Sequence, residues 1–200
     1  VVKVYNWGEY IDEEVIQMFE EETGIEVIYD TFETNEEMYP LIEAGGVAYD
    51  VICPSDYMIE KMIANDLLAE INFDNIPNME YISDEIMEGS RFFDPENKYS
   101  VPYTFGTLGI LYNSSLIDEE ITSWESLWNE EYAGNILMYN SPRDLFTAPL
   151  KLLGYSLNTT DTAELDEAKE MLLEQKPLLQ RYVMDQIKDT MISGSAAIAM

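Results

Sequence analysis

The first third of the chain alternates between short apolar segments and amphipathic segments, and this alternation limits the possible fold more than any other feature. The apolar segments fit strands, and each is followed by apolar residues at helical spacing. Strands that alternate with helices in this way form a parallel sheet through right-handed crossovers. We therefore expect an α/β protein. The predicted strands are 2–5, 25–29 and 49–53, and the predicted helices are 12–23, 34–44 and 57–66.

Local signals indicate where several helices begin and end. Thr34 with Glu37 three residues later has the spacing of a capping box, and Gly24 is a typical helix-stop residue. In the second half of the chain, Asp161 begins another capping-box spacing, ahead of a helix predicted at 161–175. These signals give the helices defined ends.

A change in composition divides the chain into two parts. Residues 70–100 are rich in Asn, Pro and Asp and are expected to be irregular, and a new apolar strand is predicted at 108–112. We therefore expect a first α/β lobe at 1–107 and a second at 108–200. The other elements predicted in the second lobe are a short helix at 123–128, a strand at 135–139, helices at 143–153 and 161–175, and a strand at 196–200.

Composition excludes several classes of function. The 200 residues hold 40 Asp and Glu against 10 Lys and Arg, a formal net charge of -30, which repels nucleic acid and attracts cations. The chain has no histidine, which argues against His-based acid–base relays and zinc sites. The single cysteine, Cys53, lies in a predicted strand and is interpreted as a core residue. No nucleic acid partner is expected.

Ligands of parallel sheets bind beyond the carboxyl ends of the strands, and two predicted strand ends carry aromatic and polar side chains. Trp7, Glu9 and Tyr10 follow the first strand, and Ser55 and Tyr57 follow the third. Rings can cover an organic cation and a carboxylate can neutralise it, so this set suits an amine. The alternative is that Trp7 and Tyr10 are packing residues at the start of a helix.

Two further acids lie near predicted strand ends. Asp56, between Ser55 and Tyr57, can also serve as a helix cap. Asp144 follows the predicted strand at 135–139 and would face a cleft from the second lobe. A linear polyamine needs carboxylates near its charged ends and flat apolar walls between them, which two lobes can supply. The alternative for Asp144 is an exposed first-turn acid stabilised by the helix dipole.

Seven segments of the sequence share their residues and order with a known family. The first is Tyr5-Asn6-Trp7-Gly8-Glu9-Tyr10, and the others are 22–27, 31–39, 49–52, 101–103, 122–128 and 153–160. Together they resemble the spermidine/putrescine-binding proteins of ABC importers, and the resemblance covers essentially the whole chain.

The resemblance implies a two-lobed fold of the periplasmic-binding type II class, which closes on polyamine by hinge motion. It implies a protein that delivers its ligand to a membrane ABC permease and catalyses no reaction, so that no catalytic residue, cofactor or metal is expected. The implied location is extracytoplasmic, either in the periplasm or lipid-anchored at the cell surface. The implied full-length protein is a monomer.

The resemblance also assigns site residues. It implies that the rings of Trp7 and Tyr10 line the polyamine slot, with Gly8 as a small residue and Glu9 as an acid beside them. It also implies that the second strand end contributes the Ser55 hydroxyl and the Tyr57 ring. Asp144 of the second lobe corresponds to an acid that meets an ammonium group.

The sequence departs from the family pattern in three ways. Ser141 stands where the family often has Asp, and Asp185 is a candidate substitute for a family serine that is missing here. The family also continues beyond the position of Met200, so the chain is expected to be truncated at its C-terminal side and to lack the segment that returns to the first lobe. Two alternatives stay open: a binding protein for another cationic or neutral small solute, and a secreted hydrolase with paired carboxylates.

Overall fold

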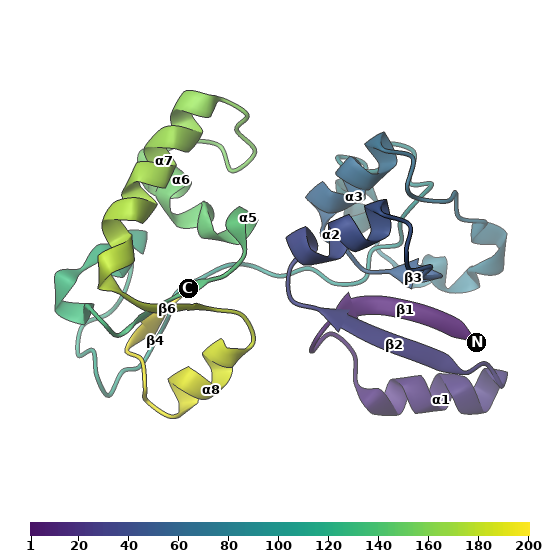
Figure 1. Cartoon of the computed structure of the whole chain (residues 1–200), viewed down its shortest axis with the longest axis horizontal. Coiled ribbons are helices and arrows are strands. Elements are labelled where there is room, and N and C mark those ends of the chain that lie inside the picture. Colours follow the sequence, from purple (N-terminus) through teal and green to yellow (C-terminus); the bar gives the residue numbers. More distant parts are fainter. The chain divides into compact units, whose positions relative to one another are not determined.

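The computed structural model describes residues 1–200 and divides them into two compact units, Val1–Phe105 and Gly106–Met200 (Figure 1). This boundary lies two residues before the one expected from the sequence, which follows residue 107. Each unit contains its own sheet, and each is described separately below.

The first unit is built on a three-stranded parallel sheet. Its strands are β1 (Val2–Trp7), β2 (Val27–Phe32) and β3 (Val51–Ile52), in the order β2-β1-β3. The predicted parallel α/β arrangement is therefore confirmed. The predicted bounds are partly wrong, because β1 continues through Trp7, β2 ends at Phe32 rather than Tyr29, and β3 has only two residues.

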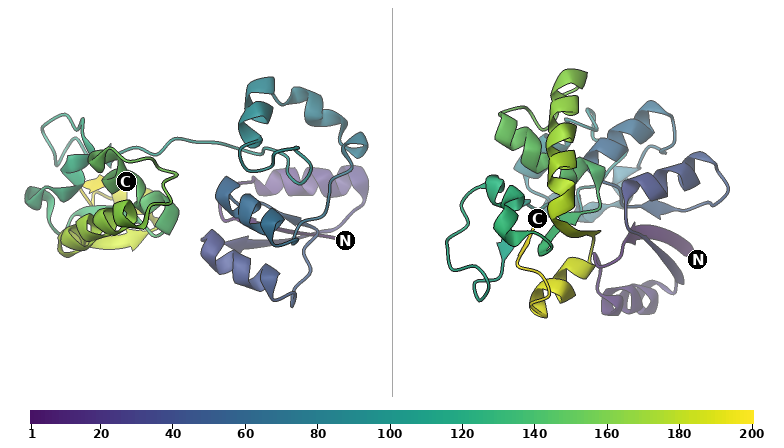
Figure 2. Two further views of the ribbon diagram at one scale, coloured as in Figure 1. Left: turned by 90° about the horizontal axis from the view of Figure 1, so that it is seen from above. Right: turned by 60° about the vertical axis from the view of Figure 1, so that its left-hand side comes forward.

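Three helices flank this sheet, with α1 (Glu13–Thr23) on one face and α2 (Asn35–Glu43) and α3 (Asp56–Ala64) on the other (Figures 1 and 2). The residues predicted to cap the start of α2 and to end α1 do so in the structure. The Thr34 hydroxyl accepts a hydrogen bond from the Glu37 amide at 3.2 Å, and Gly24 ends α1 in the left-handed conformation, with φ of 68°.

The core of the first unit lies between the sheet and the α2–α3 pair. Six buried side chains form it: Tyr5, Phe32, Met38, Tyr39, Met58 and Met62. The opposite face is different, because α1 has no buried residue, and Val15, Met18 and Phe19 are 49%, 65% and 41% exposed. This stripe of α1 leaves apolar surface in contact with solvent.

The segment predicted to be irregular, 70–100, contains a short helix, α4 (Asp84–Ser90), and two 3₁₀ helices, Phe73–Asn75 and Pro77–Tyr81. The prediction was therefore wrong for 84–90, where the Ser83 hydroxyl caps the helix by accepting from the Ile86 amide. A helix this short lacks the repeated apolar spacing by which helices are recognised in sequence.

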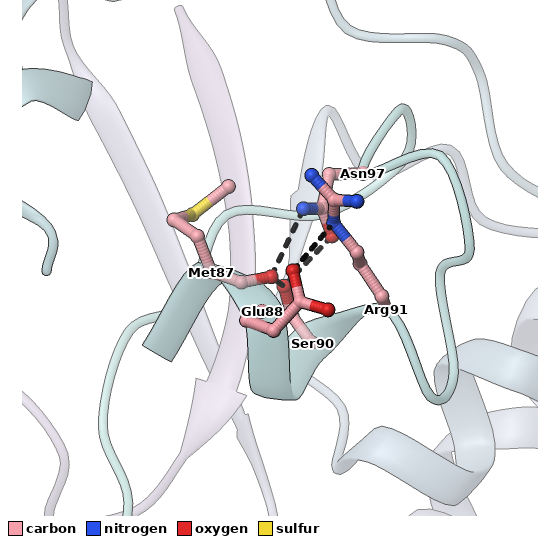
Figure 3. Close-up of polar contacts among 5 residues, drawn as sticks. All are labelled: Met87, Glu88, Ser90, Arg91 and Asn97. Atoms are coloured by element: carbon pink, nitrogen blue, oxygen red, sulfur yellow. Dashed lines mark hydrogen bonds and ion pairs between the residues drawn. The ribbon is translucent and has the colours of Figure 1, made fainter. Parts of the chain in front are cut away.

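Polar contacts hold the chain that follows α4 (Figure 3). The Ser90 hydroxyl donates to Asn97 Oδ1 at 2.7 Å, and Asn97 Nδ2 donates to the Met87 carbonyl at 3.0 Å. Arg91 Nε lies 3.3 Å from a Glu88 carboxylate oxygen. The two side-chain bonds hold Asn97, whose backbone is in the left-handed region with φ of 49°, where Asn is one of the few tolerated residues.

The second unit contains a four-stranded mixed sheet in the order β4-β7-β5-β6. Strand β5 (Ile136–Tyr139) is parallel to β6 (Leu179–Val183) and β7 (Ile198–Ala199), and β4 (Leu111–Tyr112) is antiparallel to β7. The predicted strands at 108–112, 135–139 and 196–200 each contain one of these elements. Strand β6 and the following helix α8 (Gln186–Ile192) were not predicted.

The helices of the second unit lie close to their predicted positions. Helix α7 (Thr162–Gln175) is capped by Asp161, whose carboxylate accepts from the Ala163 amide. The predicted helix at 143–153 is two helices, α5 (Pro142–Leu145) and α6 (Thr147–Leu153), and the predicted helix at 123–128 is a 3₁₀ helix, Trp124–Trp128. A further 3₁₀ helix, Glu130–Tyr132, precedes β5, and another, Lys176–Leu178, follows α7.

Strand β5 runs through the core of the second unit. On one of its faces the buried residues include Leu127, Ile136, Met138, Ala148, Ile198 and Met200, and a second cluster is formed by Leu137, Val183, Met191, Ala196 and Ala199. None of the helices in the structure is long and apolar enough to cross a bilayer.

Candidate functional site

The carboxyl ends of the three parallel strands of the first unit lie at one edge of its sheet. Trp7, the last residue of β1, is in register with Phe32, the last residue of β2, and Tyr5 is in register with Ile52, the last residue of β3. The segments that follow these strands therefore begin at the same edge, where open α/β sheets bind ligands.

Aromatic rings gather at this edge around Trp7. The Trp7 ring centroid lies 4.7 Å from that of Phe32 and 5.7 Å from that of Tyr10. Trp7 is half-buried and packs against the core, whereas Tyr10 is 46% exposed. The structure thus gives Trp7 a packing role as well as an accessible surface, and it leaves the Tyr10 ring outside the core. Apolar ring faces at a strand end can cover the methylenes or the charge of an amine.

The turn after β1 holds the other two predicted residues of this segment. Gly8 and Glu9 are exposed. The Trp7 amide donates to Asn6 Oδ1 at 2.8 Å, and the carbonyl of Tyr10 accepts from the Tyr103 hydroxyl, a residue 93 positions later in the same unit. The bond from Tyr103 ties the end of this turn to a distant segment of the unit.

The second predicted pair, Ser55 and Tyr57, is joined by a third residue. Asn35 Nδ2 donates to Ser55 Oγ at 3.0 Å and to the Tyr57 hydroxyl at 2.9 Å, and the Ser55 amide donates to Asn35 Oδ1 at 3.2 Å. The Tyr57 hydroxyl in turn donates to Glu36 Oε1 at 2.9 Å. The network links the start of α2 to the start of α3.

The interpretation of Asp56 as a helix cap is corrected by this geometry. Ser55 occupies the N-cap position of α3 and makes no side-chain cap bond, and Asp56 is the first helical residue. The Asp56 carboxylate accepts from the Tyr57 amide at 2.7 Å. The acid therefore satisfies one amide at the helix start from within the helix.

Sequence reasoning missed Phe32, Asn35 and Glu36 at this edge. The predicted end of the second strand at Tyr29 placed Phe32 outside the strand, although its ring packs directly on Trp7. Asn35 follows Thr34, so the capping box located the start of α2 but gave no sign of the bonds that reach α3. Those bonds join residues about 20 positions apart, and only the folded sheet brings them together.

Asp144 lies in the second unit, in α5, just beyond the carboxyl end of β5. It is half-buried. Burial raises the pKa of the nearby Tyr139 phenol, Asp144 and Asp185 raise it further, and Lys188 opposes them. The negative charges of Asp144 and Asp185 therefore both disfavour ionisation of the Tyr139 phenol. The neighbouring Arg143 donates to the Leu157 carbonyl at 2.9 Å and to Asn158 Oδ1, which ties it to the chain after α6.

The chain offers no reactive cysteine and no clustered metal ligands. Burial raises the pKa of the Cys53 thiol to about 11, so the thiol stays protonated at neutral pH. No group of three or more Cys, Asp or Glu side chains is arranged to hold a metal ion. The chemistry at the edge of the first sheet is that of aromatic faces, hydroxyls and carboxylates.

A parallel α/β unit with rings and polar groups at the carboxyl edge of its sheet has the architecture of a small-molecule binding protein. The chain belongs to the family of bacterial extracellular solute-binding proteins, whose model matches residues 14–200. The expected fold class is thereby confirmed.

Individual relatives make the similarity more specific. The chain is 37% identical over 198 residues to the spermidine/putrescine-binding periplasmic protein of Salmonella typhimurium, a match that covers 98% of this chain. It is 41% identical to the structure of a putative spermidine/putrescine ABC transporter protein from Listeria monocytogenes, with a TM-score of 0.92 and 99% of this chain covered. A spermidine/putrescine substrate-binding protein from Streptococcus pneumoniae is 42% identical, with a TM-score of 0.75. The resemblance stated from the sequence is confirmed.

These relatives are longer than the chain. The chain spans 56% of the length of the Salmonella protein and 61% of the Listeria and Streptococcus structures. The names of the curated relatives describe binding proteins and none of them names a catalysed reaction.

Proposed function

We propose that the protein is an extracytoplasmic solute-binding protein that captures polyamines of the spermidine and putrescine type and delivers them to an ABC importer, in the periplasm or at the cell surface. One observation carries the proposal: Trp7, Tyr10 and Phe32 form an aromatic group at the carboxyl edge of the first sheet, in a chain 37% identical to a spermidine/putrescine-binding protein. The protein binds and releases its ligand and catalyses no reaction.

The chemistry of the edge suits an amine. A polyamine carries ammonium groups separated by methylenes, and ring faces attract ammonium charge while they pack against the methylenes. Carboxylates at the ends of the ligand neutralise the charge. The formal net charge of -30 also concentrates cations near the surface and favours their capture.

Most of the ligand-binding residues in this proposal lie in the first unit. Trp7 and Tyr10 supply rings, Glu9 supplies an acid, and Gly8 is the small residue between them. Ser55 and Tyr57 add a hydroxyl and a ring from the start of α3. Asp144 is proposed to meet an ammonium group from the second unit.

We also propose that the first unit is incomplete without a further segment of the kind that the longer relatives contain. The exposed stripe on α1, formed by Val15, Met18 and Phe19, supports this proposal, because amphipathic helices normally bury such a stripe. The relatives' greater length provides the residues that such a segment needs.

A thermal-shift panel tests the proposal against other ligand classes. The chain is heated with putrescine, spermidine, a neutral oligosaccharide or Ca²⁺ in parallel. A ligand at ~100 times its dissociation constant adds about 2.7 kcal/mol to the free energy of unfolding if it binds only the native state. We expect the two polyamines to raise the midpoint and the oligosaccharide to leave it unchanged. A rise with Ca²⁺ alone would assign the function to the acidic surface and contradict the proposal.

A further inference from the structure

Asn35 uses its whole side-chain amide inside the protein. It is only 2% exposed, and both of its Nδ2 hydrogens are donated, one to Ser55 Oγ and one to the Tyr57 hydroxyl, at 3.0 and 2.9 Å. Its Oδ1 accepts from the Ser55 amide at 3.2 Å. An amide has two donors and one acceptor oxygen, so every group is engaged. A side chain placed in this way does not touch a ligand, yet it holds two residues that the proposed site requires.

The bonds from Asn35 determine what Tyr57 and Ser55 can present to a ligand. The Tyr57 hydroxyl accepts a hydrogen bond from Asn35 and donates one to Glu36 Oε1 at 2.9 Å. The hydrogen of the hydroxyl and one of its two acceptor positions are therefore used within the protein. We infer that the ring is the main surface that Tyr57 presents to a ligand. Ser55 stands at the N-cap of α3, where a serine hydroxyl normally accepts from the first turn, but here it accepts from Asn35 instead.

We propose that Asn35 is a positioning residue of the polyamine site: it orients Ser55 and Tyr57 so that Tyr57 packs its ring against the ligand's methylenes and does not bind an ammonium group through its hydroxyl. The inference rests on the proposed function. It adds a residue that lies outside the ligand-contacting set, and it assigns Glu36 the role of accepting the hydrogen bond of the Tyr57 phenol.

Substitution of Asn35 by aspartate tests the inference, because a positioning role and a simple charge effect predict opposite changes in spermidine affinity. Asn35→Asp keeps the size of the side chain but removes both donors and adds a carboxylate. If only the local charge mattered, the added negative charge would tighten the binding of a polycation. We expect instead a loss of affinity for spermidine of about tenfold, the effect of one or two lost hydrogen bonds. Asn35→Ala, which adds no charge, is expected to lose affinity to a similar extent.

Asn78→Asp is the matched control for this charge change. Asn78 is an exposed residue of the same unit, in the 3₁₀ helix Pro77–Tyr81. We expect the spermidine affinity of this variant to stay within about twofold of the unsubstituted chain, because exposed charges interact weakly in water. Affinity that is unchanged or tighter in Asn35→Asp, together with unchanged affinity in Asn35→Ala, would overturn the inference.

A double substitution tests the role assigned to the Tyr57 hydroxyl. If Tyr57→Phe acts only by breaking the network, then adding it to Asn35→Ala should weaken spermidine binding by less than about twofold further, since coupled residues are not additive. A hydroxyl that binds the ammonium group directly would instead multiply the two losses. That result would refute the assignment of the ring as the contacting group.

A measurement without ligand separates this inference from the proposed function. The ¹⁹F resonance of a 3-fluorotyrosine placed at position 57 alone reports the environment of that ring. We expect one narrow resonance in the parent and in Asn78→Asp, and a shifted or broadened resonance in Asn35→Ala. An unchanged resonance would overturn the positioning role whether or not amines bind. A changed resonance in a chain that ignores spermidine at millimolar concentration would support the positioning role and contradict the proposed function.

Discussion

The Trp7 ring lies 4.7 Å from the Phe32 ring at the point where β1 and β2 both end. Phe32 is 5% exposed and belongs to the core, whereas Trp7 is half-buried. The buried Phe32 ring thus packs against the partly accessible Trp7 ring. The Tyr10 ring centroid lies 5.7 Å from that of Trp7. A ring that packs against a buried ring is already held in place before a ligand binds, so it loses little conformational freedom on binding.

Removal of the Trp7 ring should therefore weaken polyamine binding. We expect Trp7→Ala to lose about tenfold or more in spermidine affinity, because a desolvated cation–π contact contributes about 2 kcal/mol. Trp7→Phe, which keeps a ring, should lose less. Calorimetric titration measures both, with Phe92→Ala as the control, since Phe92 is 89% exposed in the same unit. Equal affinities in Trp7→Ala and Phe92→Ala would remove Trp7 from the site.

Asp144 provides the corresponding test in the second unit. Asp144→Asn keeps the shape of the side chain and removes its charge, so an ammonium group that it pairs with would lose a charge-assisted hydrogen bond. We expect a loss of about tenfold in spermidine affinity, an effect of the size measured for hydrogen bonds to charged groups. Asp118→Asn, an exposed acid of the same unit, makes the same change in charge and should have little effect. Equal losses in the two variants would indicate a general effect of net charge.

Asp94 is predicted to stabilise the first unit rather than to bind ligand. It is 1% exposed, and its carboxylate accepts from the amides of Lys98, Tyr99 and Ser100 at 2.8–3.0 Å and from the Ser100 hydroxyl. Asp94→Asn replaces an acceptor oxygen by an amide that faces these donors. We expect the free energy of unfolding to fall by about 2 kcal/mol, as measured by urea denaturation.

The control for that measurement is Asp74→Asn, an exposed acid in the 3₁₀ helix Phe73–Asn75. Its free energy of unfolding should stay within about 0.5 kcal/mol of the parent, as for most surface substitutions. If Asp94→Asn is as stable as Asp74→Asn, the bonds to the chain after α4 contribute nothing to stability.

The raised pKa of Cys53 predicts a loss of stability at alkaline pH. Burial shifts the thiol pKa from 9.0 to about 11, so the folded state holds the proton more tightly than the unfolded state does. The resulting stabilisation is complete below pH 9 and is lost as the pH rises through 11. Cys53→Ala should therefore show a shallower decline in the free energy of unfolding between these pH values. Parallel declines in parent and variant would show that Cys53 does not contribute.

The elements that the sequence predicted well are those with local causes. Gly24 ends α1 through its own left-handed conformation, and Thr34 caps α2 through a bond to a residue three positions away. Strand β6 was missed because its central residues, Gln180 and Arg181, are polar and exposed at the edge of the sheet. A strand with this composition is formed through its pairing with β5. That pairing leaves no signal in the local sequence pattern of 179–183.

The same distinction applies to the candidate site. The position of Trp7, Tyr10, Ser55 and Tyr57 near one edge of the sheet could be predicted, because each lies at the end of a strand or shortly after it and parallel strands end at the same edge. Asn35 could not, because its role depends on bonds to α3 that form only when α2 and α3 pack on the same face of the sheet. That residue makes no ligand contact in the proposal, so no pattern of ligand chemistry indicates it.

Calorimetric titration of spermidine into the 200-residue chain tests the proposed function most directly. Saturable binding with one molecule of spermidine per chain, abolished or greatly weakened in Trp7→Ala and retained in Phe92→Ala, is the predicted result. A folded chain that gives no saturable heat with spermidine or putrescine at millimolar concentration would contradict polyamine capture by these residues.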